Sequence, residues 1–530
     1  MAKTYNKKGK KKKSKYKPQY EKAQKYLKIA ILIILCIIIT YPPYFRGLYF
    51  EAEQLVFDIF AFAAFAAFWA YKLIKKDGRL ISTPAEYASL GLALAYFLSL
   101  LAAIALRQAV AEWLKYCAYF AVFLMLTELA GTKRGRTAFL WTIAVSGAGI
   151  ALLGIDGAAG MKIASIINKI FAALGAKTDV IFDTFVGGRV HSTLQYPNSL
   201  AAYLAALYFA CLGLAAASGR LWQKAFACGL CFVSLAAFAL TISRGAYLLL
   251  PAGAAIFLTA LPKGTRISSC AYALASVIPA VPAAVKLSGY ISAGGGSARK
   301  IWTAVFAGIL ASALLGIAAY KAGKLLERFG WKIYAGATAA CLAASAAGII
   351  YISGAAVPLE LANTGEGQAD KWSVERKSVM LKPGEYRLEY EVEASMAGDK
   401  PYAYSVAVNS RDREGVLFGK SKTLATMTGK ATDGAEKREA AFSVPEGSLV
   451  TDIYFRNYYA GTAAVFHSAR VADAGTGKTV KELKLKYKYL PNAIMSRLEN
   501  YLADKSLIQR LVYYGDGLKM IRERWLLGAG

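Results

Sequence analysis

Two arginines are the side chains in this sequence best suited to chemistry on a phosphate. Arg189 lies in GGRVHSTLQYPNSLAAYL, just before a long apolar run, and Arg244 lies in ALTISRGAYLLL, between two other such runs. A guanidinium keeps its charge on burial, and its planar fork can bind two phosphate oxygens at once. The two residues together therefore suit a pyrophosphate. The alternative from the residues alone is that each reaches to a membrane interface or caps a helix C-terminus.

The elements that must position these arginines are membrane helices. Of the 530 residues, 56% are hydrophobic and 18% are charged, and the mean hydropathy is +0.37, so the chain is more apolar than an ordinary soluble domain. A helix needs about 20 residues to cross ~30 Å of hydrocarbon. We predict a multi-pass α-helical membrane protein with about eleven spans, near 27–45, 53–72, 86–106, 109–130, 138–154, 199–217, 222–241, 245–261, 268–285, 301–320 and 332–353.

The net charge of +30 fits membrane topology better than nucleic-acid binding. The run KKGKKKKSKYK is predicted to be a disordered cytoplasmic tail held near anionic lipid. With that tail inside, strict alternation makes every predicted inside loop basic, as the positive-inside rule requires. The predicted outside loop 286–300, which has three basic residues, does not follow this rule. Both arginines, and everything after residue 354, are then extracytoplasmic; the expected partners include the lipid bilayer and no nucleic acid.

The composition changes after about Pro358. In YRLEYEVEA, apolar and charged residues alternate, which predicts a strand with one wet face. Similar runs predict an extracytoplasmic β-sandwich, at 402–409, 415–419, 439–445, 450–457 and 463–472. Segment 161–174 has helical spacing of isoleucines and is predicted to lie in the interface plane. The domains we expect are a basic cytoplasmic tail (1–26), a transmembrane helical domain (27–354), the sandwich (355–488) and outer-surface amphipathic helices (489–530).

The cysteines do not indicate a disulfide framework. All seven fall within predicted spans, and none lies in the extracytoplasmic part. Cys228 and Cys231 form a CxxC inside an apolar helix with no second pair, which favours packing over metal or redox chemistry.

The second part of the chain carries a resemblance of its own. LKPGEYRLEYEVEA and IYFRNYYAGTAAVFHSARVAD resemble carbohydrate-binding modules of the jelly-roll type, which often carry LxPGxYxLxxxV near the start. The resemblance implies that tyrosines stack on sugar rings; the alternative is that they pack in the core or cover the sheet. The candidates are Tyr402, Tyr404, Tyr454, Tyr458 and Tyr459.

The arginine motifs carry another resemblance. A Pro-Asn pair at 197–198 stands just before a span, a Ser-Arg-Gly at 243–245 stands at a later helix mouth, and the chain closes with the stretch 510–530. In this order they are similar to the O-antigen ligase and O-antigen polymerase-related superfamily, although Trp525 stands where a proline is usual.

This second resemblance implies an enzyme that moves a saccharide from undecaprenyl pyrophosphate to an acceptor hydroxyl at the outer face of the cytoplasmic membrane. Arg189 and Arg244 would be the catalytic residues, binding the diphosphate and stabilising the leaving group, so no cofactor and no metal would be needed. The acceptor could be lipid A core, a growing glycan or a protein hydroxyl. Substrate-binding residues would be His191, Tyr196, Asn198, Ser243 and Arg510.

The catalytic histidine of that superfamily lies in a large outer loop beyond the closing glycine pair. This sequence stops at Gly530, and its two histidines are His191 and His467. We therefore expect either a longer protein with a further loop and span, or a catalytically incomplete chain. His191 could replace the missing base or could be an ordinary hydrogen-bonded histidine. His467 is expected in the core or on a face of the sheet.

The residues are also compatible with other functions. The chain could be a surface-polysaccharide polymerase or a protein O-oligosaccharyltransferase of the same superfamily, or a non-catalytic membrane protein that presents a glycan-binding sandwich. A transporter is disfavoured because the spans contain almost no acids and show no clear inverted repeat.

Overall fold

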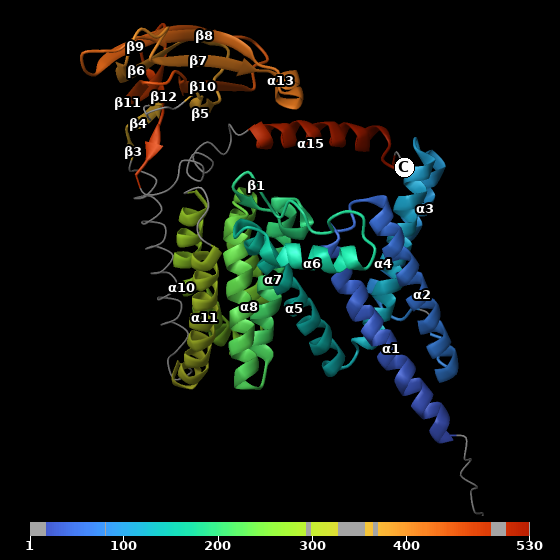
Figure 1. Ribbon diagram of the computed structural model, residues 1–530. Helices are drawn as coiled ribbons and strands as arrows, with labels where there is room; N and C mark the ends of the chain where they lie inside the picture. The colour runs from blue at the N-terminus through green and yellow to red at the C-terminus, as the bar shows by residue number, and fades with distance from the viewer. Residues whose placement is uncertain are drawn as a thin grey trace, which may run out of the picture. The chain divides into compact units, whose positions relative to one another are not determined.

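The computed structural model describes residues 17–79, 81–292, 298–326, 356–363, 369–488 and 505–528. The chain divides into two compact units, which are described separately. The first comprises residues 1–330 and 526–530 and is helical; the second comprises residues 331–525 and is rich in β-strands (Figure 1). The predicted span 332–353 lies outside the described residues.

The helical unit is built mainly from long apolar helices. Within the described ranges, nine are long and apolar enough to cross a membrane, by length and composition alone. The helix predicted at 245–261 is also present but is not among these nine, and the segment 161–174, predicted to lie in the interface plane, forms the helix α6. The helices are α1 (Lys17–Tyr44), α2 (Glu51–Lys75), α3 (Pro84–Ser99), α4 (Leu106–Leu129), α5 (Lys133–Ala158), α6 (Lys162–Ala173), α7 (Pro197–Ala217), α8 (Leu221–Leu240), α9 (Arg244–Ala260), α10 (Lys263–Ser292) and α11 (Ala298–Leu326).

Two hydrophobic clusters hold this unit together. The larger joins α5, α7, α8, α10 and α11, with α8 buried along most of its length. The smaller joins α1, α2 and α4 with the start of α5. Because lipid is as apolar as these side chains, close packing and internal hydrogen bonds, rather than the hydrophobic effect, associate such helices.

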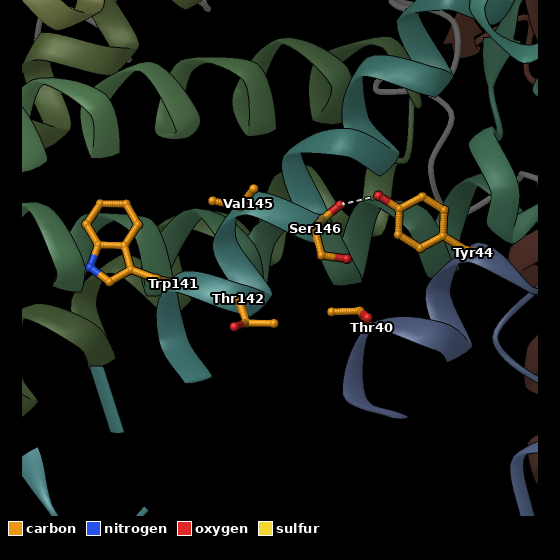
Figure 2. A pocket seen from close by; sticks show the side chains of 6 residues that line it. All are labelled: Thr40, Tyr44, Trp141, Thr142, Val145 and Ser146. Atoms are coloured by element: carbon orange, nitrogen blue, oxygen red, sulfur yellow. Dashed lines mark hydrogen bonds between the residues drawn. The ribbon is translucent and has the colours of Figure 1, made fainter. Parts of the chain in front are cut away.

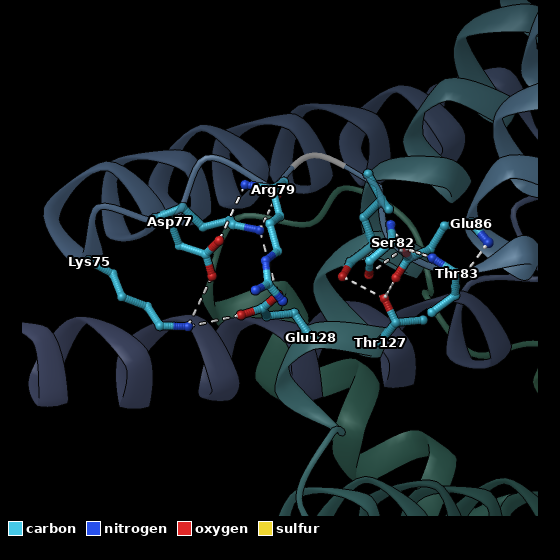
Figure 3. A network of polar contacts seen from close by, with 10 residues as sticks. Lys75, Asp77, Arg79, Ser82, Thr83, Glu86, Thr127 and Glu128 are labelled. Carbon is cyan, nitrogen blue, oxygen red and sulfur yellow. Dashed lines mark hydrogen bonds and ion pairs between the residues drawn. The ribbon is translucent and has the colours of Figure 1, made fainter.

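A polar network fixes the start of α3 against the end of α4 (Figure 3). The carboxylate of Glu86 accepts the backbone N–H groups of Ser82 and Thr83, at 2.7 and 3.0 Å, and the hydroxyl of Thr127 at 2.7 Å. The Thr83 hydroxyl accepts the Glu86 N–H at 3.3 Å, which completes a capping box. Glu86 is buried, and its negative charge is thus satisfied by four donors, the fourth being the Ser82 hydroxyl.

Two antiparallel sheets of the second unit share one core, as predicted for a sandwich, and β3 and β13 pair separately. One sheet has the order β5-β10-β7-β8; the other has the order β12-β11-β6-β9, with β4 also pairing β11. Alternate residues of both sheets fill the space between them, among them Leu388, Val406 and Phe455. The strands are β3 (Ala356–Val357), β4 (Leu359–Asn363), β5 (Ser373–Val379), β6 (Gly384–Met396), β7 (Tyr404–Arg411), β8 (Lys422–Gly429), β9 (Glu436–Val444), β10 (Val450–Asn457), β11 (Thr462–Asp473), β12 (Thr479–Glu482) and β13 (Lys486–Tyr487).

Two helices complete the second unit. The prediction of a strand at 415–419 is wrong, because the helix α13 (Arg413–Phe418) occupies this segment. The Asp412 carboxylate caps the start of α13 by accepting the Gly415 N–H at 2.8 Å, and Gly419, with φ +81°, ends the helix. Helix α15 (Lys505–Glu523) packs on α13, where Ile508 joins a small apolar cluster.

Candidate anion-binding site

A two-residue hairpin places Arg189. Strands β1 (Phe185–Val186) and β2 (Arg189–Val190) pair with Val186 opposite Arg189. Gly187 and Gly188 form the turn, with φ of +59° and +73°. Two central residues with positive φ match the tight hairpin turns in which glycine is strongly favoured. The consecutive glycines before Arg189 therefore determine the direction in which the chain returns.

The hairpin is fixed to the helical unit on one side by α5. Val190 is fully buried, and a Cβ on Gly154 of α5 would lie 2.5 Å from its Cγ1. The hydroxyl of Ser192 donates to the Ile150 carbonyl of the same helix at 2.6 Å. The missing side chain at position 154 thus makes the space in which β2 lies.

Helix α6 holds the segment that leads into the hairpin. The amide of the buried Asn168 donates to the Ile181 carbonyl at 2.7 Å and accepts the Val180 and Ile181 N–H groups at 3.2 and 2.9 Å. Its isoleucines Ile166 and Ile170 are instead exposed. Asn168 therefore lies on the side of α6 that faces the protein, whereas the charged residues Lys162 and Lys169 are exposed, as the two isoleucines are.

The Arg189 guanidinium lies against the corner between α8 and α9. Its Nε donates to the Thr241 carbonyl at 2.7 Å, and its Nη2 donates to the Ile242 carbonyl at 3.3 Å and the Asn198 Oδ1 at 3.4 Å. Asn198 lies in the first turn of α7, and its Oδ1 also accepts the Ser243 hydroxyl at 2.9 Å. One cationic side chain is thus held where α8 ends and where α7 and α9 begin.

The corner itself has an unusual backbone. Ile242 has φ +49°, a left-handed conformation that is a genuine outlier for a β-branched residue and costs on the order of 1–3 kcal/mol. Ser243 follows as the buried N-cap residue of α9, and Arg244 is the first residue of that helix. The N-terminus of a helix carries a partial positive charge and orphan N–H donors. The guanidinium of Arg189 and the start of α9 therefore meet at one place.

His191 lies in the turn that follows β2. Its Nδ1 is 3.2 Å from the Gln195 carbonyl, and burial, reinforced by the nearby Arg189 charge, lowers its pKa from the ordinary value, although the Gln195 carbonyl acts in the other direction. The imidazole is therefore neutral near pH 7. When Nδ1 carries the proton and donates it to the carbonyl, Nε2 carries the lone pair.

Two further hydrogen bonds fix the turn that carries His191. Thr193 donates its hydroxyl to the Pro43 carbonyl of α1 at 2.7 Å, and the Gln195 side chain donates to the Phe182 carbonyl at 3.2 Å. Ser192 and Gln195 both have left-handed φ values, +51° and +53°. Strained non-glycine residues of this kind persist only where the surroundings hold them.

The structure brings together five of the residues singled out from the sequence. Arg189, Asn198 and Ser243 are linked by hydrogen bonds, the Asn198 amide nitrogen donates to the Tyr196 hydroxyl at 3.0 Å, and His191 lies two residues from Arg189. The backbone of Arg244 adjoins Ser243; its side chain is outside what the structure describes. Arg510 is exposed on α15 and belongs to the second unit.

Sequence reasoning missed the acceptors of the arginine. Thr241 and Ile242 contribute main-chain carbonyls, and a carbonyl leaves no signal in residue types. The strained φ at Ile242 likewise contradicts the residue's own preference, so no local pattern could predict it. The Gly187-Gly188 pair was the one readable signal for the hairpin.

A lateral depression lies between α1 and α5 (Figure 2). Its volume is about 580 Å³, and its walls carry Trp141, Val145 and hydroxyl-bearing side chains from the two helices. The Tyr44 hydroxyl donates to the Ser146 carbonyl at 2.9 Å. Ile150, which anchors the His191 turn, lies one helical turn beyond Ser146 on α5, so the depression ends close to the hairpin.

The second unit gathers aromatic side chains at one end of the sandwich. Ring centroids lie 4.6 Å apart for Trp372 and Tyr458, 5.1 Å for Tyr458 and Tyr459, and 4.9 Å for Tyr459 and Tyr402. Trp372 is half exposed, whereas Tyr404 is buried in the core. We call Trp372, Tyr402, Tyr458 and Tyr459 the aromatic patch; Trp372 was not among the residues predicted to stack on sugars.

His467 lies on the outer face of the five-stranded sheet. Its Nε2 is 3.4 Å from a Glu393 carboxylate oxygen, next to an ion pair of 2.7 Å between Arg470 and Glu389. These side chains belong to a solvent-facing sheet surface, one of the two placements expected for His467.

No family model and no curated protein matches the chain. The solved structures that are similar to part of it include two carbohydrate-binding modules. One is a "Family 16 Carbohydrate Binding Module-2", 12% identical, with 22% of this chain and 76% of that chain covered and a TM-score of 0.18. The other is TmCBM61 in complex with β-1,4-galactotriose, 10% identical, with 22% and 70% covered and a TM-score of 0.16.

Proposed function

We propose that the helical unit binds the diphosphate of a polyprenyl-linked saccharide beside Arg189 and transfers the saccharide to an acceptor hydroxyl at the outer face of the membrane. The observation that carries the proposal is the guanidinium held at the start of α9, next to Ser243 and Asn198. A fixed cation, a helix N-terminus and neutral hydrogen-bonding groups together suit an anion of high charge. The resemblance of the motifs around Arg189 and Arg244 to O-antigen ligases agrees with this assignment.

The reaction needs only charge stabilisation and one proton acceptor. The acceptor oxygen forms a bond to the anomeric carbon, the bond from that carbon to the phosphate oxygen breaks, and its electron pair leaves with the polyprenyl diphosphate. Arg189, with Arg244, would stabilise the charge that develops on the leaving oxygen. The acceptor's proton would pass to Nε2 of the neutral His191.

The depression between α1 and α5 would receive the first isoprene units of the donor. It ends one helical turn from Ile150, which holds the His191 turn. Its hydroxyls at Thr40 and Thr142 donate to carbonyls of their own helices, so the wall offers mainly methyl groups and the Trp141 ring to a ligand (Figure 2). Such a wall is compatible with a hydrocarbon chain.

The test compares two arginines that have the same local role. Arg266 donates its Nε to the Leu261 carbonyl at 2.9 Å and its Nη2 to the Thr259 carbonyl at 2.7 Å, as Arg189 does at the end of α8. Arg189→Lys, which keeps the charge but loses the fork, should reduce transfer of lipid-linked saccharide in membrane vesicles about a hundredfold or more. Arg266→Lys should not. If both variants transfer at the wild-type rate, or lose it equally, Arg189 only caps a helix.

A second candidate function is glycan binding by the β-rich unit without transfer. The aromatic patch favours it, because partly exposed rings offer flat apolar faces to the C–H faces of a sugar. Full-length protein should bind cell-surface polysaccharide, and Trp372→Ala should weaken that binding while Tyr404→Phe, a change in the buried core, should not. Unchanged binding by Trp372→Ala would exclude the patch.

A further inference from the structure

Helix α15 carries an exposed apolar side. The sequence predicts amphipathic helices over 489–530, and α15 (Lys505–Glu523) lies within this range. Five large apolar side chains of α15 and of the turn after it are between 58% and 76% exposed. The N–H of Arg524 still donates to the Met520 carbonyl at 2.9 Å, so the helical rotation continues into that turn. The five follow one another at intervals of three or four residues and therefore lie on one side of the helix. We call them the apolar stripe: Leu511, Tyr514, Leu518, Ile521 and Trp525.

Another side of α15 docks on the β-rich unit. Ile508 is 5% exposed and joins Val416 of α13 and Val450 of β10 in an apolar cluster. The carboxylate of Asp516 pairs with the Arg413 guanidinium of α13 at 2.6 Å. At about 100° of rotation per residue, these two contacts lie about 140° around the helix from the apolar stripe. The stripe therefore points away from the elements on which α15 docks.

Cations border the apolar stripe, and the carboxylates of α15 lie elsewhere. The same rotation places Arg510 and Arg524 along one edge of the stripe and Arg522 along the other, and all three are exposed. Asp516 and Glu523 lie on the docked side. An apolar face that is bordered by cations, with the acids on the far side, is typical of helices that lie on an anionic lipid surface.

The composition of the stripe favours a lipid surface over a second copy of this helix. Tyr514 and Trp525 are 66% and 76% exposed, and these two residue types are enriched where a membrane meets water, because their rings are apolar with one polar group. A second α15 packed stripe to stripe would bring arginines against arginines, which is unfavourable. Phosphates of anionic lipid would instead neutralise them.

The same chain keeps α15 near a bilayer. Among the residues that the structure describes, the helical unit has nine helices that are long and apolar enough to cross a membrane. A tether of this kind makes docking of α15 an intramolecular event, so one short helix suffices. Helix α15 has 19 residues and carries charges at Arg510, Asp516 and Lys519, so it suits the interface plane rather than a span.

We propose that α15 is a peripheral membrane anchor of the β-rich unit. The apolar stripe inserts at the boundary between headgroups and acyl chains of a leaflet that contains anionic phospholipid, and the bordering arginines bind lipid phosphates. Ile508 and Asp516, on the docked side, attach the β-rich unit to the inserted helix. Such helices bury their apolar face about 5–10 Å deep. The inference depends neither on saccharide transfer nor on glycan binding.

The test uses full-length protein at one copy per lipid nanodisc. An environment-sensitive fluorescent amino acid replaces either Leu518 on the apolar stripe or Glu523 on the docked side. The nanodiscs contain phosphatidylcholine alone or with phosphatidylglycerol, and a part of the lipid carries a quencher at the boundary between headgroups and acyl chains. The quencher should reduce emission from position 518, and more so when phosphatidylglycerol is present, whereas position 523 should be little affected.

Variants with the probe at position 518 assign the docking to the stripe and to its cations. Ile521→Gln should lower the ratio of docked to undocked α15 about tenfold or more. The matched control is Met520→Gln, which removes an exposed apolar side chain from another side of the helix and should dock as the parent does. Arg522→Gln and Arg524→Gln should each lower the ratio about fivefold, and only with phosphatidylglycerol present.

Four results would overturn the proposal. They are no quenching at position 518, equal quenching at 518 and 523, equal losses in Ile521→Gln and Met520→Gln, and docking that is indifferent to phosphatidylglycerol. A change in emission that appears only with two copies per nanodisc would assign the stripe to a second copy of the chain instead. Hydrogen exchange of β7 and β10 verifies that each variant is folded.

Discussion

A substitution at Gly154 tests how closely the hairpin packs against α5. Adding one methyl group there, in Gly154→Ala, would place a Cβ 2.5 Å from Val190 Cγ1 and 3.1 Å from Ser192 Cβ. Neither neighbour is the end of a flexible chain, so the strand or the helix must move. Overpacking of this kind costs typically 1–3 kcal/mol. The matched control is Gly91→Ala on α3, where a Cβ would meet nothing within 4 Å.

Both substitutions replace glycine by alanine inside a helix, so both gain about 0.8–1.0 kcal/mol of helix propensity. Gly91→Ala should therefore be neutral or stabilising, whereas Gly154→Ala should be less stable than Gly91→Ala by about 1–3 kcal/mol. Denaturation in nanodiscs, followed by near-UV circular dichroism, measures the difference. Because a shift of about 1 Å can cost 10²-fold in rate, transfer should fall much more than stability.

Equal stability of the two variants would refute this reasoning. It would mean that Val190 does not pack on α5 as described, and the position of Arg189 would then lose its support. A Gly154→Ala variant that is destabilised but transfers at the normal rate would leave the packing intact and refute the link between the hairpin and the proposed site.

Three further outcomes are expected. Burial and Arg189 hold the pKa of His191 below its ordinary value of 6.5, so transfer should persist at pH 7 and fall only as the pH drops below about 6.5. His191→Gln should lower the transfer rate about 10²–10⁴-fold and abolish the fall in rate at acidic pH. If the pH profile of this variant is unchanged, His191 is not the general base. Thr83→Ala, which breaks the capping box of α3, should cost about 1 kcal/mol in the same denaturation assay. On α15, Ile508→Ala should destabilise the docked helix by about 2 kcal/mol or more, whereas Arg413→Ala, which breaks an exposed pair with Asp516, should cost less than about 1 kcal/mol; hydrogen exchange of α15 distinguishes them.

Apolar runs predicted the helices because each long helix satisfies its own backbone and needs little information from elsewhere. All ten spans predicted between residues 27 and 320 coincide with helices, although the helix at 245–261 is not among the nine that are long enough to cross a membrane. The strand wrongly predicted at 415–419 shows the limit of this approach. There the apolar residues Val416 and Phe418 were read as alternation, while Asp412 and Gly419, the two capping residues, carried the real signal.

The candidate site was only partly predictable. The residue type of Arg189 pointed to an anion site, Asn198 and Ser243 became candidates only through the family resemblance, and these three side chains do meet. Their meeting depends on the hairpin turn, on the gap at Gly154 and on the left-handed Ile242, which are features of tertiary structure. The aromatic patch shows the same division: Tyr402, Tyr458 and Tyr459 gather with Trp372, but alternation did not place Tyr404 in the core.

Helix α6 gives the hairpin a mechanical link to its surroundings. Its isoleucines Ile166 and Ile170 are more than half exposed, whereas Asn168 on the opposite face hydrogen-bonds residues 180 and 181. In a bilayer, headgroup packing and acyl-chain thickness would determine the depth at which α6 inserts. The hydrogen bonds of the Asn168 amide would then transmit each change in that depth to Arg189. Lipid composition should therefore affect the site even though no lipid contacts it.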